Sequence, residues 1–185
     1  MAAIGNGGTL YQPQLVSKIQ PPEGGAPTYE FAPIETGTLP LKPEQLAALQ
    51  EGLHMVTVDC IGCIGTARDR FRGLPDWLKV AGKTGTAEDP GEFGLNEPDA
   101  WFAGYTFAER EGKPDIAIAV VISNRGGGSA FAAPVFRRIV EAYFGLSYRL
   151  YPWEAAIGVT STPPPTPTPT GLLPPPGSET PTPSP

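Results

Sequence analysis

This 185-residue chain contains an unbroken apolar run, Ile116-Ala117-Ile118-Ala119-Val120-Val121-Ile122, which limits its possible folds more than any other segment. Successive side chains of a strand point to opposite faces of its sheet. A run with no polar residue on either face therefore predicts a strand between Asp115 and Ser123 that is covered on both faces. Such a strand needs partner strands and covering elements, which the neighbouring segments are expected to supply.

Two strands and a helix are predicted around this run. Residues 78–86 and 99–107 have strand character, and the loops between the strands are short enough for an antiparallel meander. One face of the second strand holds Trp101, Ala103, Tyr105 and Phe107. An amphipathic helix that can cover one sheet face is predicted from Phe131, Val135, Ile139, Val140 and Phe144. The predicted fold class is α+β, with an antiparallel sheet of three C-terminal strands packed against helices.

The N-terminal half is predicted to contain shorter elements. Ala2-Ala3-Ile4 is expected to be the last turn of a helix, with a left-handed cap in Gly5-Asn6-Gly7. Predicted strands at 15–19 and 29–31 flank a segment rich in proline and glycine, which end regular secondary structure. This arrangement predicts an exposed hairpin. A helix is predicted to begin at Pro43, with one buried stripe formed by Leu46, Leu49, Leu53 and Val56. A short second helix is expected over 66–71.

The motif best suited to binding or catalysis is Lys83-Thr84-Gly85-Thr86, at the end of the first predicted strand. Gly85 allows another backbone to approach, and two threonine hydroxyls beside a cation suit a carboxylate and an amide. A phosphate-binding loop is the main rival, because Gly82-Lys83-Thr84 also matches the end of that motif. Its first glycine is replaced by Trp77, and no helix signal follows to supply a phosphate-binding N-terminus. An ordinary strand with an exposed lysine remains an alternative for these residues alone.

Further segments surround this motif in a fixed order. They are Ile4-Gly5-Asn6-Gly7-Gly8-Thr9-Leu10-Tyr11 with Pro13, Gly65-Thr66-Ala67, Val80-Ala81-Gly82-Lys83-Thr84-Gly85-Thr86-Ala87, Ala100-Trp101-Phe102-Ala103-Gly104-Tyr105, and Ala133-Pro134-Val135-Phe136. Together, from about Ala2 to about Phe144, they resemble the penicillin-binding protein transpeptidase family, whose signatures are S-x-x-K, S-x-N and K-T-G. The resemblance implies a partial β-lactamase/transpeptidase-like fold.

The resemblance also implies a role for each residue of the motif. Members of the family attack the D-alanyl-D-alanine end of a cell-wall stem peptide with a serine, and β-lactams react with the same serine. By resemblance, Lys83 is an electrostatic partner of the catalytic groups, while Thr84, Gly85 and Thr86 bind substrate, with both hydroxyls on its carboxylate. The backbone N–H of Thr86 supplies half of an oxyanion hole. No cofactor and no metal are implied.

The other two signatures are absent. No serine is followed by lysine three residues later, and no Ser-x-Asn occurs. Both lie upstream of this segment in the family, so residues 1–150 are expected to be the C-terminal part of a transpeptidase domain. The nucleophilic serine is then absent from the chain, which is expected to be inactive without the upstream half of the domain. A class A bifunctional penicillin-binding protein is one possible parent.

Residues 151–185 are expected to be a disordered tail rich in Pro, Thr and Ser, because proline fixes φ and supplies no backbone donor. A stalk and an inert terminus are both compatible with this composition. The net charge of -6 argues against a nucleic-acid partner. No apolar run is long enough to span a membrane. By resemblance, the chain is extracytoplasmic and associated with the cell envelope through a membrane anchor outside it.

The remaining candidate residues are His54 and two cysteines. His54 is the only histidine, and a structural position on its helix is expected. Cys60-Ile61-Gly62-Cys63 leaves a local disulfide, a free pair and a zinc site open. The location implied by the resemblance favours the disulfide. The glycine-rich segment 125–129 is predicted to be a turn between strand and helix.

Three functional hypotheses follow. The first is a peptidoglycan D,D-transpeptidase, active only with its upstream half, whose partners are the D-Ala-D-Ala stem peptide and β-lactams. The second is a non-catalytic stem-peptide binding module that keeps the Lys-Thr-Gly strand. The third is a fragment of a D,D-carboxypeptidase or β-lactamase relative. Residues 4–11 and 100–105 favour the transpeptidases over the β-lactamases.

Overall fold

The computed structural model describes residues 1–60, 62–88, 91, 94, 96–146 and 154–155. Residues Met1–Gly145 form one compact unit. The predicted tail at 151–185 lies almost entirely outside the described residues, so its disorder stays a prediction. None of the helices in the described part of the chain has both the length and the apolar character that a membrane span requires.

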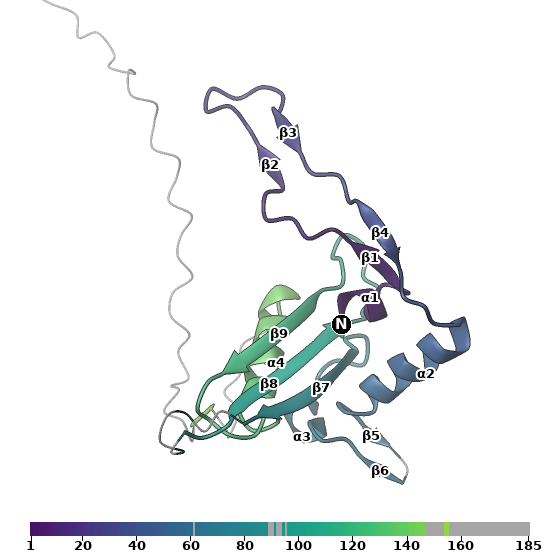
Figure 1. Ribbon diagram of the computed structural model, residues 1–185, viewed down its shortest axis with the longest axis vertical. Coiled ribbons are helices and arrows are strands. Elements are labelled where there is room, and N and C mark those ends of the chain that lie inside the picture. The colour runs from purple at the N-terminus through teal and green to yellow at the C-terminus, as the bar shows by residue number, and fades with distance from the viewer. Residues whose placement is uncertain (61, 89–90, 92–93, 95, 147–153, 156–185) are drawn as a thin grey trace, which may run out of the picture. The chain divides into compact units, whose positions relative to one another are not determined.

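An antiparallel sheet of three strands confirms the predicted meander and the α+β fold class (Figure 1). The strands are β7 (Val80–Ala87), β8 (Asp99–Thr106) and β9 (Ala117–Ile122), with β8 in the centre. Their register pairs Gly82 with Gly104 and Lys83 with Ala103. Consecutive strands are therefore neighbours in the sheet, as short connections require.

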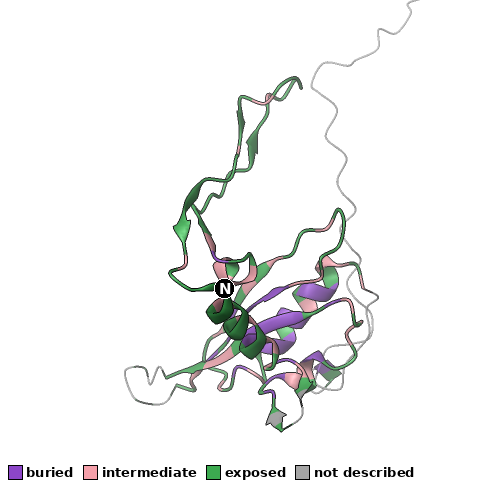
Figure 2. Ribbon diagram, turned by 90° about the vertical axis from the view of Figure 1, so that its right-hand side faces the viewer, coloured by how far each residue is buried: buried purple, intermediate pink, exposed green. Residues whose placement is uncertain are grey.

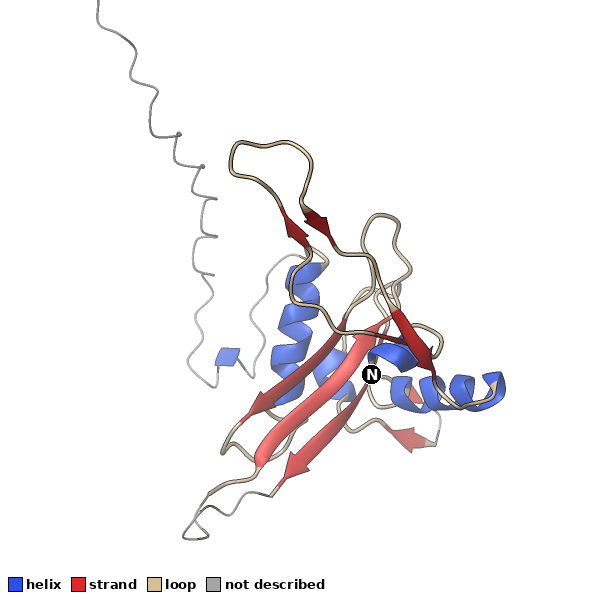
Figure 3. Ribbon diagram, turned by 45° about the horizontal axis from the view of Figure 1, so that its top comes forward, coloured by secondary structure: helices blue, strands red, loops and turns tan. Residues whose placement is uncertain are grey.

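Helix α4 (Ala132–Tyr143) packs across one face of this sheet, as Figures 1 and 3 show. Phe102 and Phe136 are both fully buried, and their ring centroids lie 4.8 Å apart. Phe71 packs on Phe102 at 5.4 Å. Gly104 is packed tightly on both sides, because a Cβ atom there would clash with the Ala81 carbonyl oxygen of β7 and lie 3.1 Å from the Phe136 ring. These aromatic contacts form the centre of the core on this face.

The row of α4 side chains that faces the sheet differs from the predicted one. Phe136 and Val140 are completely buried, whereas the predicted Phe131, Val135 and Ile139 remain 37%, 39% and 40% exposed. Both rows have helical spacing, so periodicity alone does not distinguish them. In the observed row Phe136 packs over Gly104, and of the predicted buried residues only Val140 is fully buried.

The prediction that the third strand is covered on both faces is wrong for the described residues. Val120 is buried on the face that α4 covers, but Ala117, Ala119 and Val121 are exposed. The elements on the opposite face contact β7 and β8. An apolar run therefore predicted the strand correctly but overestimated its burial, because the covering elements extend only part of the way across the sheet.

Two N-terminal helices lie on that opposite face. Leu53 of α2 (Pro43–His54) packs with Met1 and Ile4 against Ala81 and Tyr105. Of the predicted α2 stripe, Leu53 is buried, Leu46 and Val56 are half-buried, and Leu49 is exposed. Helix α1 (Ala2–Gly5) ends in the predicted left-handed cap. In this cap Gly7 has φ +88° and the Gly8 N–H donates to the Ala3 carbonyl at 2.7 Å.

The segment 9–38 forms an exposed arm. Its base is a pairing of β1 (Thr9–Tyr11) with β4 (Glu35–Thr38), which the sequence did not predict. Its outer part is the expected hairpin, shortened to β2 (Lys18–Ile19) and β3 (Tyr29–Glu30). Figure 2 shows that the arm is mostly exposed, in contrast to the buried interior of the sheet.

A small hairpin and a short helix connect α2 to the sheet. The hairpin consists of β5 (Asp59–Cys60) and β6 (Cys63–Ile64), and its register places Cys60 opposite Cys63. Helix α3 (Arg68–Phe71) follows, beginning two residues later than predicted. Its Phe71 is the aromatic residue that packs on Phe102.

Candidate functional site

The Lys-Thr-Gly motif lies on β7, which is an edge strand of the sheet within the described part of the chain. Because side chains alternate along a strand, Thr84 and Thr86 share one face while Lys83 and Gly85 share the other. Lys83 and Thr86 are exposed, and Thr84 and Gly85 are half-buried. The first three residues of β7 are buried. The motif is therefore the accessible end of a strand whose other end is fixed in the core.

The open edge of β7 presents the backbone groups of every second residue. The Lys79 carbonyl accepts from Phe107 at 3.1 Å, toward the β8 side, whereas the Val80 carbonyl accepts from the Thr57 hydroxyl at 2.7 Å on the other side. Backbone direction alternates along a strand, so Thr84 and Thr86 point their N–H groups away from β8. None of the described residues accepts a hydrogen bond from either N–H.

A cation and two hydroxyls gather at this edge. The Lys83 Nζ atom donates to the Thr84 carbonyl at 2.7 Å, which holds the ammonium group beside the outward backbone of the motif. The Thr84 Oγ1 atom lies 3.2 Å from the Oγ1 atom of Thr66. Thr66 precedes α3 and is exposed. The edge thus combines positive charge, hydroxyl groups and backbone N–H donors, which together suit an anionic peptide end.

The glycines at this site permit close packing within the chain. A Cβ atom at Gly85 would lie 3.0 Å from Cβ of Trp101, its partner on β8. A Cβ atom at Gly128 would meet the Gly85 backbone and the Trp101 carbonyl. The segment 125–129 connects β9 to α4, as predicted, and its Gly128 packs directly against the backbone of the motif. Intramolecular contact therefore explains Gly85 at least in part.

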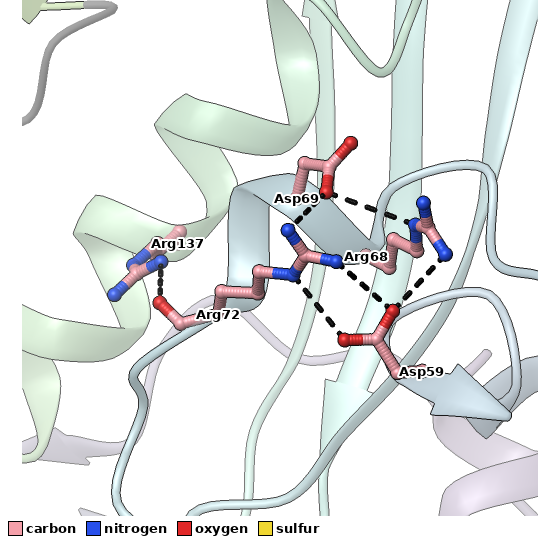
Figure 4. Close-up of polar contacts among 5 residues, drawn as sticks. All are labelled: Asp59, Arg68, Asp69, Arg72 and Arg137. Carbon is pink, nitrogen blue, oxygen red and sulfur yellow. Dashed lines mark hydrogen bonds and ion pairs between the residues drawn. The ribbon is translucent and has the colours of Figure 1, made fainter.

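Ion pairs connect helix α3 to the β5–β6 hairpin, as Figure 4 shows. The Asp59 carboxylate accepts from Nε and Nη2 of Arg72, both at 3.2 Å, and pairs with Arg68 at 3.1 Å. Asp69 pairs with Arg72 at 3.1 Å. The hydrogen bond from Arg72, aided by the charges of both arginines, lowers the pKa of Asp59 from its usual 3.8. Asp59 in turn raises the pKa of Arg72.

A buried arginine attaches α3 to α4. Arg137 is 1% exposed and donates through Nη1 to the carbonyl oxygens of Arg70 at 2.6 Å and Arg72 at 2.8 Å. Its Nε donates to Glu141 at 2.8 Å. Arg70 in turn donates to the carbonyl of Ser129 at 3.1 Å. The position of α3 is therefore set by α4 and by the glycine-rich turn together.

The other sequence candidates have structural positions or stay predictions. His54 contacts the Val80 carbonyl through Nδ1 at 2.8 Å and packs edge-on against Phe107 at 5.0 Å, as expected for a structural histidine. The disulfide between Cys60 and Cys63 stays a prediction. Among the described residues, no group of three or more His, Cys, Asp or Glu side chains could hold a metal ion.

Thr66 is the site residue that the sequence did not identify. It belongs to one of the segments that resemble the penicillin-binding protein family, but the sequence predicts no role for it. Because 18 residues separate Thr66 from Thr84, the sequence gives no sign that the two are in contact. No periodicity connects positions so far apart on different elements. The segment Gly65-Thr66-Ala67 next to a Lys-Thr-Gly strand is the one signal that could have suggested the contact.

The fold and the motif on its open edge agree with a match between this chain and a known protein family. The family model of the penicillin binding protein transpeptidase domain matches residues 1–141. The chain belongs to this family, as the sequence predicted.

Named relatives place the chain within the family. It is 28% identical over 146 residues to the peptidoglycan D,D-transpeptidase PbpA of Mycobacterium tuberculosis, a match that covers 76% of this chain and 27% of the relative. It is 31% identical to penicillin-binding protein 1A of Streptococcus pneumoniae, with 75% of this chain and 19% of the relative covered. The chain thus spans about a quarter or less of these relatives.

Solved structures agree with this assignment. The ceftriaxone acyl-enzyme complex of penicillin-binding protein A from Mycobacterium tuberculosis matches with a TM-score of 0.59 and 29% identity, covering 77% of this chain and 30% of that one. Penicillin-binding protein 2B of Streptococcus pneumoniae matches with a TM-score of 0.61 at 22% identity, over 80% of this chain and 24% of that one. The second likeness concerns the fold alone.

Proposed function

We propose that this chain is the Lys-Thr-Gly part of a peptidoglycan D,D-transpeptidase that binds the D-Ala-D-Ala end of stem peptides and is acylated by β-lactams. The observation that carries the proposal is the open edge of β7, where the outward N–H groups of Thr84 and Thr86 lie beside the Lys83 ammonium. An extended peptide can add to such an edge as a further strand.

Each residue of the motif then has a distinct task. The hydroxyls of Thr84 and Thr86 bind the terminal carboxylate, while Gly85 between them lets the motif pack closely against Trp101 and Gly128. The Thr86 N–H donates to the oxyanion that forms when the carbonyl carbon is attacked. Lys83 supplies positive charge that stabilises the anionic substrate. The same charge favours the neutral, deprotonated form of the base that activates the serine, which is the lysine of the Ser-x-x-Lys motif. The carbonyl carbon is attacked by a serine, which becomes acylated while the terminal D-alanine leaves.

The attacking serine comes from outside this sequence, because no serine here has lysine three residues later. We therefore propose that residues 1–150 are the C-terminal part of a transpeptidase domain and that the upstream part supplies the Ser-x-x-Lys and Ser-x-Asn motifs. The Pro/Thr-rich composition of 151–185 favours a class A parent. The family's substrate implies an extracytoplasmic site of action, with a membrane anchor outside this chain.

Labelling with a fluorescent penicillin tests the proposal. The chain alone should form no covalent adduct, whereas the complete domain with its upstream part should form one that survives denaturing electrophoresis. In the complete domain, Lys83→Ala should slow acylation about 100-fold, since removing a preorganised electrostatic contact has effects of this order. Thr86→Val should slow it about tenfold, because its backbone N–H remains and one hydrogen bond to a charged group is lost.

Lys79→Ala is the matched control, since Lys79 is an exposed lysine just before β7 that lies over the Phe107 ring. It should leave the acylation rate unchanged. An adduct on a serine of the isolated chain would overturn the assignment of the nucleophile to an upstream part. Reversible stem-peptide binding by a complete protein that never acylates would favour the non-catalytic module instead.

A further inference from the structure

Thr66 extends the site to a second element of the fold. It stands outside the sheet, yet its hydroxyl oxygen lies 3.2 Å from that of Thr84. We propose that Thr66 is a third hydroxyl ligand for the terminal carboxylate of the substrate, beside the hydroxyls of Thr84 and Thr86. This inference rests on the proposed function and deepens it.

The hydroxyl groups of Thr66 and Thr84 leave one O–H donor available for a ligand. Each threonine hydroxyl carries one proton and two acceptor lone pairs. Only one of the two protons can lie between the oxygens of Thr66 and Thr84, so the other O–H remains available to a ligand. Thr66 is exposed and Thr84 is half-buried, so a ligand can reach this second proton from solvent.

The charge at this position favours an anion. The Lys83 ammonium is held at the Thr84 carbonyl, 2.7 Å away, on the same open edge of β7. A carboxylate has two oxygens with about four lone-pair positions and accepts several hydrogen bonds at once. Bonds to an ionised acceptor are shorter and stronger than bonds between neutral groups. A carboxylate therefore gains more from the Thr66 hydroxyl than a neutral amide in the same place.

The backbone on both sides of Thr66 is fixed. A Cβ atom at Gly65 would lie between 2.5 and 2.8 Å from the carbonyl oxygens of Met55, Val56 and Val58, so only glycine fits there. Ala67 is 1% exposed, and its N–H donates to the Val56 carbonyl at 3.0 Å. Thr66 is consequently a solvent-facing side chain between two tightly packed residues.

The contacts of α3 complete this support. Arg137 attaches the end of α3 to α4, and Asp59 attaches it to the β5–β6 hairpin (Figure 4). A hydroxyl held in place before binding loses little conformational entropy when the ligand arrives. The structure thus presents Thr66 as a preorganised ligand on a separate element rather than as a mobile surface residue.

The test compares two acylating agents on the complete domain that contains this chain and its serine-bearing part. Benzylpenicillin carries the free carboxylate, and its methyl ester lacks the negative charge. Thr66→Val should slow acylation by benzylpenicillin about tenfold, the loss expected for one hydrogen bond to a charged group. The rate with the ester should not change. Thr66→Ser should restore the benzylpenicillin rate, because it keeps the hydroxyl.

Two controls separate ligand contact from damage to the fold. Thr36→Val removes a threonine hydroxyl that donates to the Leu10 carbonyl in the arm, and it should affect neither rate. Thr66→Ala repeats the test with a side chain that adds no bulk. The wild-type domain must first be acylated by benzylpenicillin. If Thr66→Val then slows both agents equally, or slows neither, the inference is overturned and the proposed function stays intact. A wild-type domain that benzylpenicillin does not acylate overturns both.

Discussion

The central sheet and the arm are both antiparallel ladders, but they differ in what covers them. In the sheet, Ala100 and Phe102 are completely buried beneath helix α4. In the arm, every residue of β2, β3 and β4 is exposed, and Leu15 between β1 and β2 is 104% exposed. Backbone pairing alone gives marginal stability in water, whereas burying apolar surface is strongly favourable. The sheet should therefore carry most of the stability of this unit.

Strand β7 connects the stable interior to the accessible edge. Its first three residues are buried, and its last five are exposed or half-buried. One end of the strand is thus fixed in the core, while the motif at the other end stays accessible. If stability and function separate between the sheet and the arm in this way, substitutions in the sheet should cost far more stability than changes in the arm.

The largest loss of stability is expected from Phe102→Ala. This residue is 0% exposed and contacts the rings of Phe71 and Phe136. Removing a buried aromatic ring should lower the free energy of unfolding by about 4 kcal/mol. Tyr29→Ala in the arm is the matched control and should cost less than about 1 kcal/mol, since Tyr29 is 40% exposed. Urea denaturation of both variants measures this difference, and equal losses would contradict it.

A slightly smaller loss is expected from Arg137→Ala. The substitution leaves the carbonyl oxygens of Arg70 and Arg72 without this donor and removes one guanidinium partner of Glu141. Breaking a buried charge network should cost about 3 kcal/mol. The control Arg125→Ala changes an exposed arginine near the same helix and should cost about 0.5 kcal/mol or less. A loss no larger than that of the control would mean that Arg137 does not anchor α3.

A weaker, pH-dependent effect is expected at Asp59. Its pKa is lowered in the folded chain, mainly by the Arg72 hydrogen bond, so it contributes stability above its ordinary pKa of 3.8. That contribution is lost as the pH falls through the lower folded value. Asp59→Asn should therefore show a flatter loss of stability below pH 3.8 than the wild-type chain. Parallel curves from thermal unfolding across this pH range would rule out the contribution.

The smallest effect is expected from shortening the arm. Replacing residues 18–30 with a short Gly-Ser turn removes β2 and β3, which are fully exposed. Stability should change by less than about 1 kcal/mol, because loop length alters closure entropy only slowly. Calorimetry measures the change, and penicillin labelling of the complete domain shows whether the site is intact. A large loss of either would show that the arm supports the sheet or the site.

Local patterns in the sequence were sufficient to predict much of this protein. Apolar runs and short connections predicted the three strands of the sheet, and Pro43 marked the start of α2. The Lys83–Thr86 motif, together with the ordered segments around it, identified the family. These features depend on residues that are close in the chain or on residue types in a fixed order, so no knowledge of the tertiary structure was needed.

How these elements meet could not be predicted from local sequence. Phe136 rather than Val135 faces the sheet, where it packs over Gly104 and against the Phe102 ring. A face of β9 remains exposed because α1 and α2 lie over β7 and β8. The pairing of β1 with β4 and the contact of Thr66 with Thr84 join segments far apart in the chain. Such contacts depend on the shapes of both partners and on backbone direction, which hydrophobic periodicity does not encode.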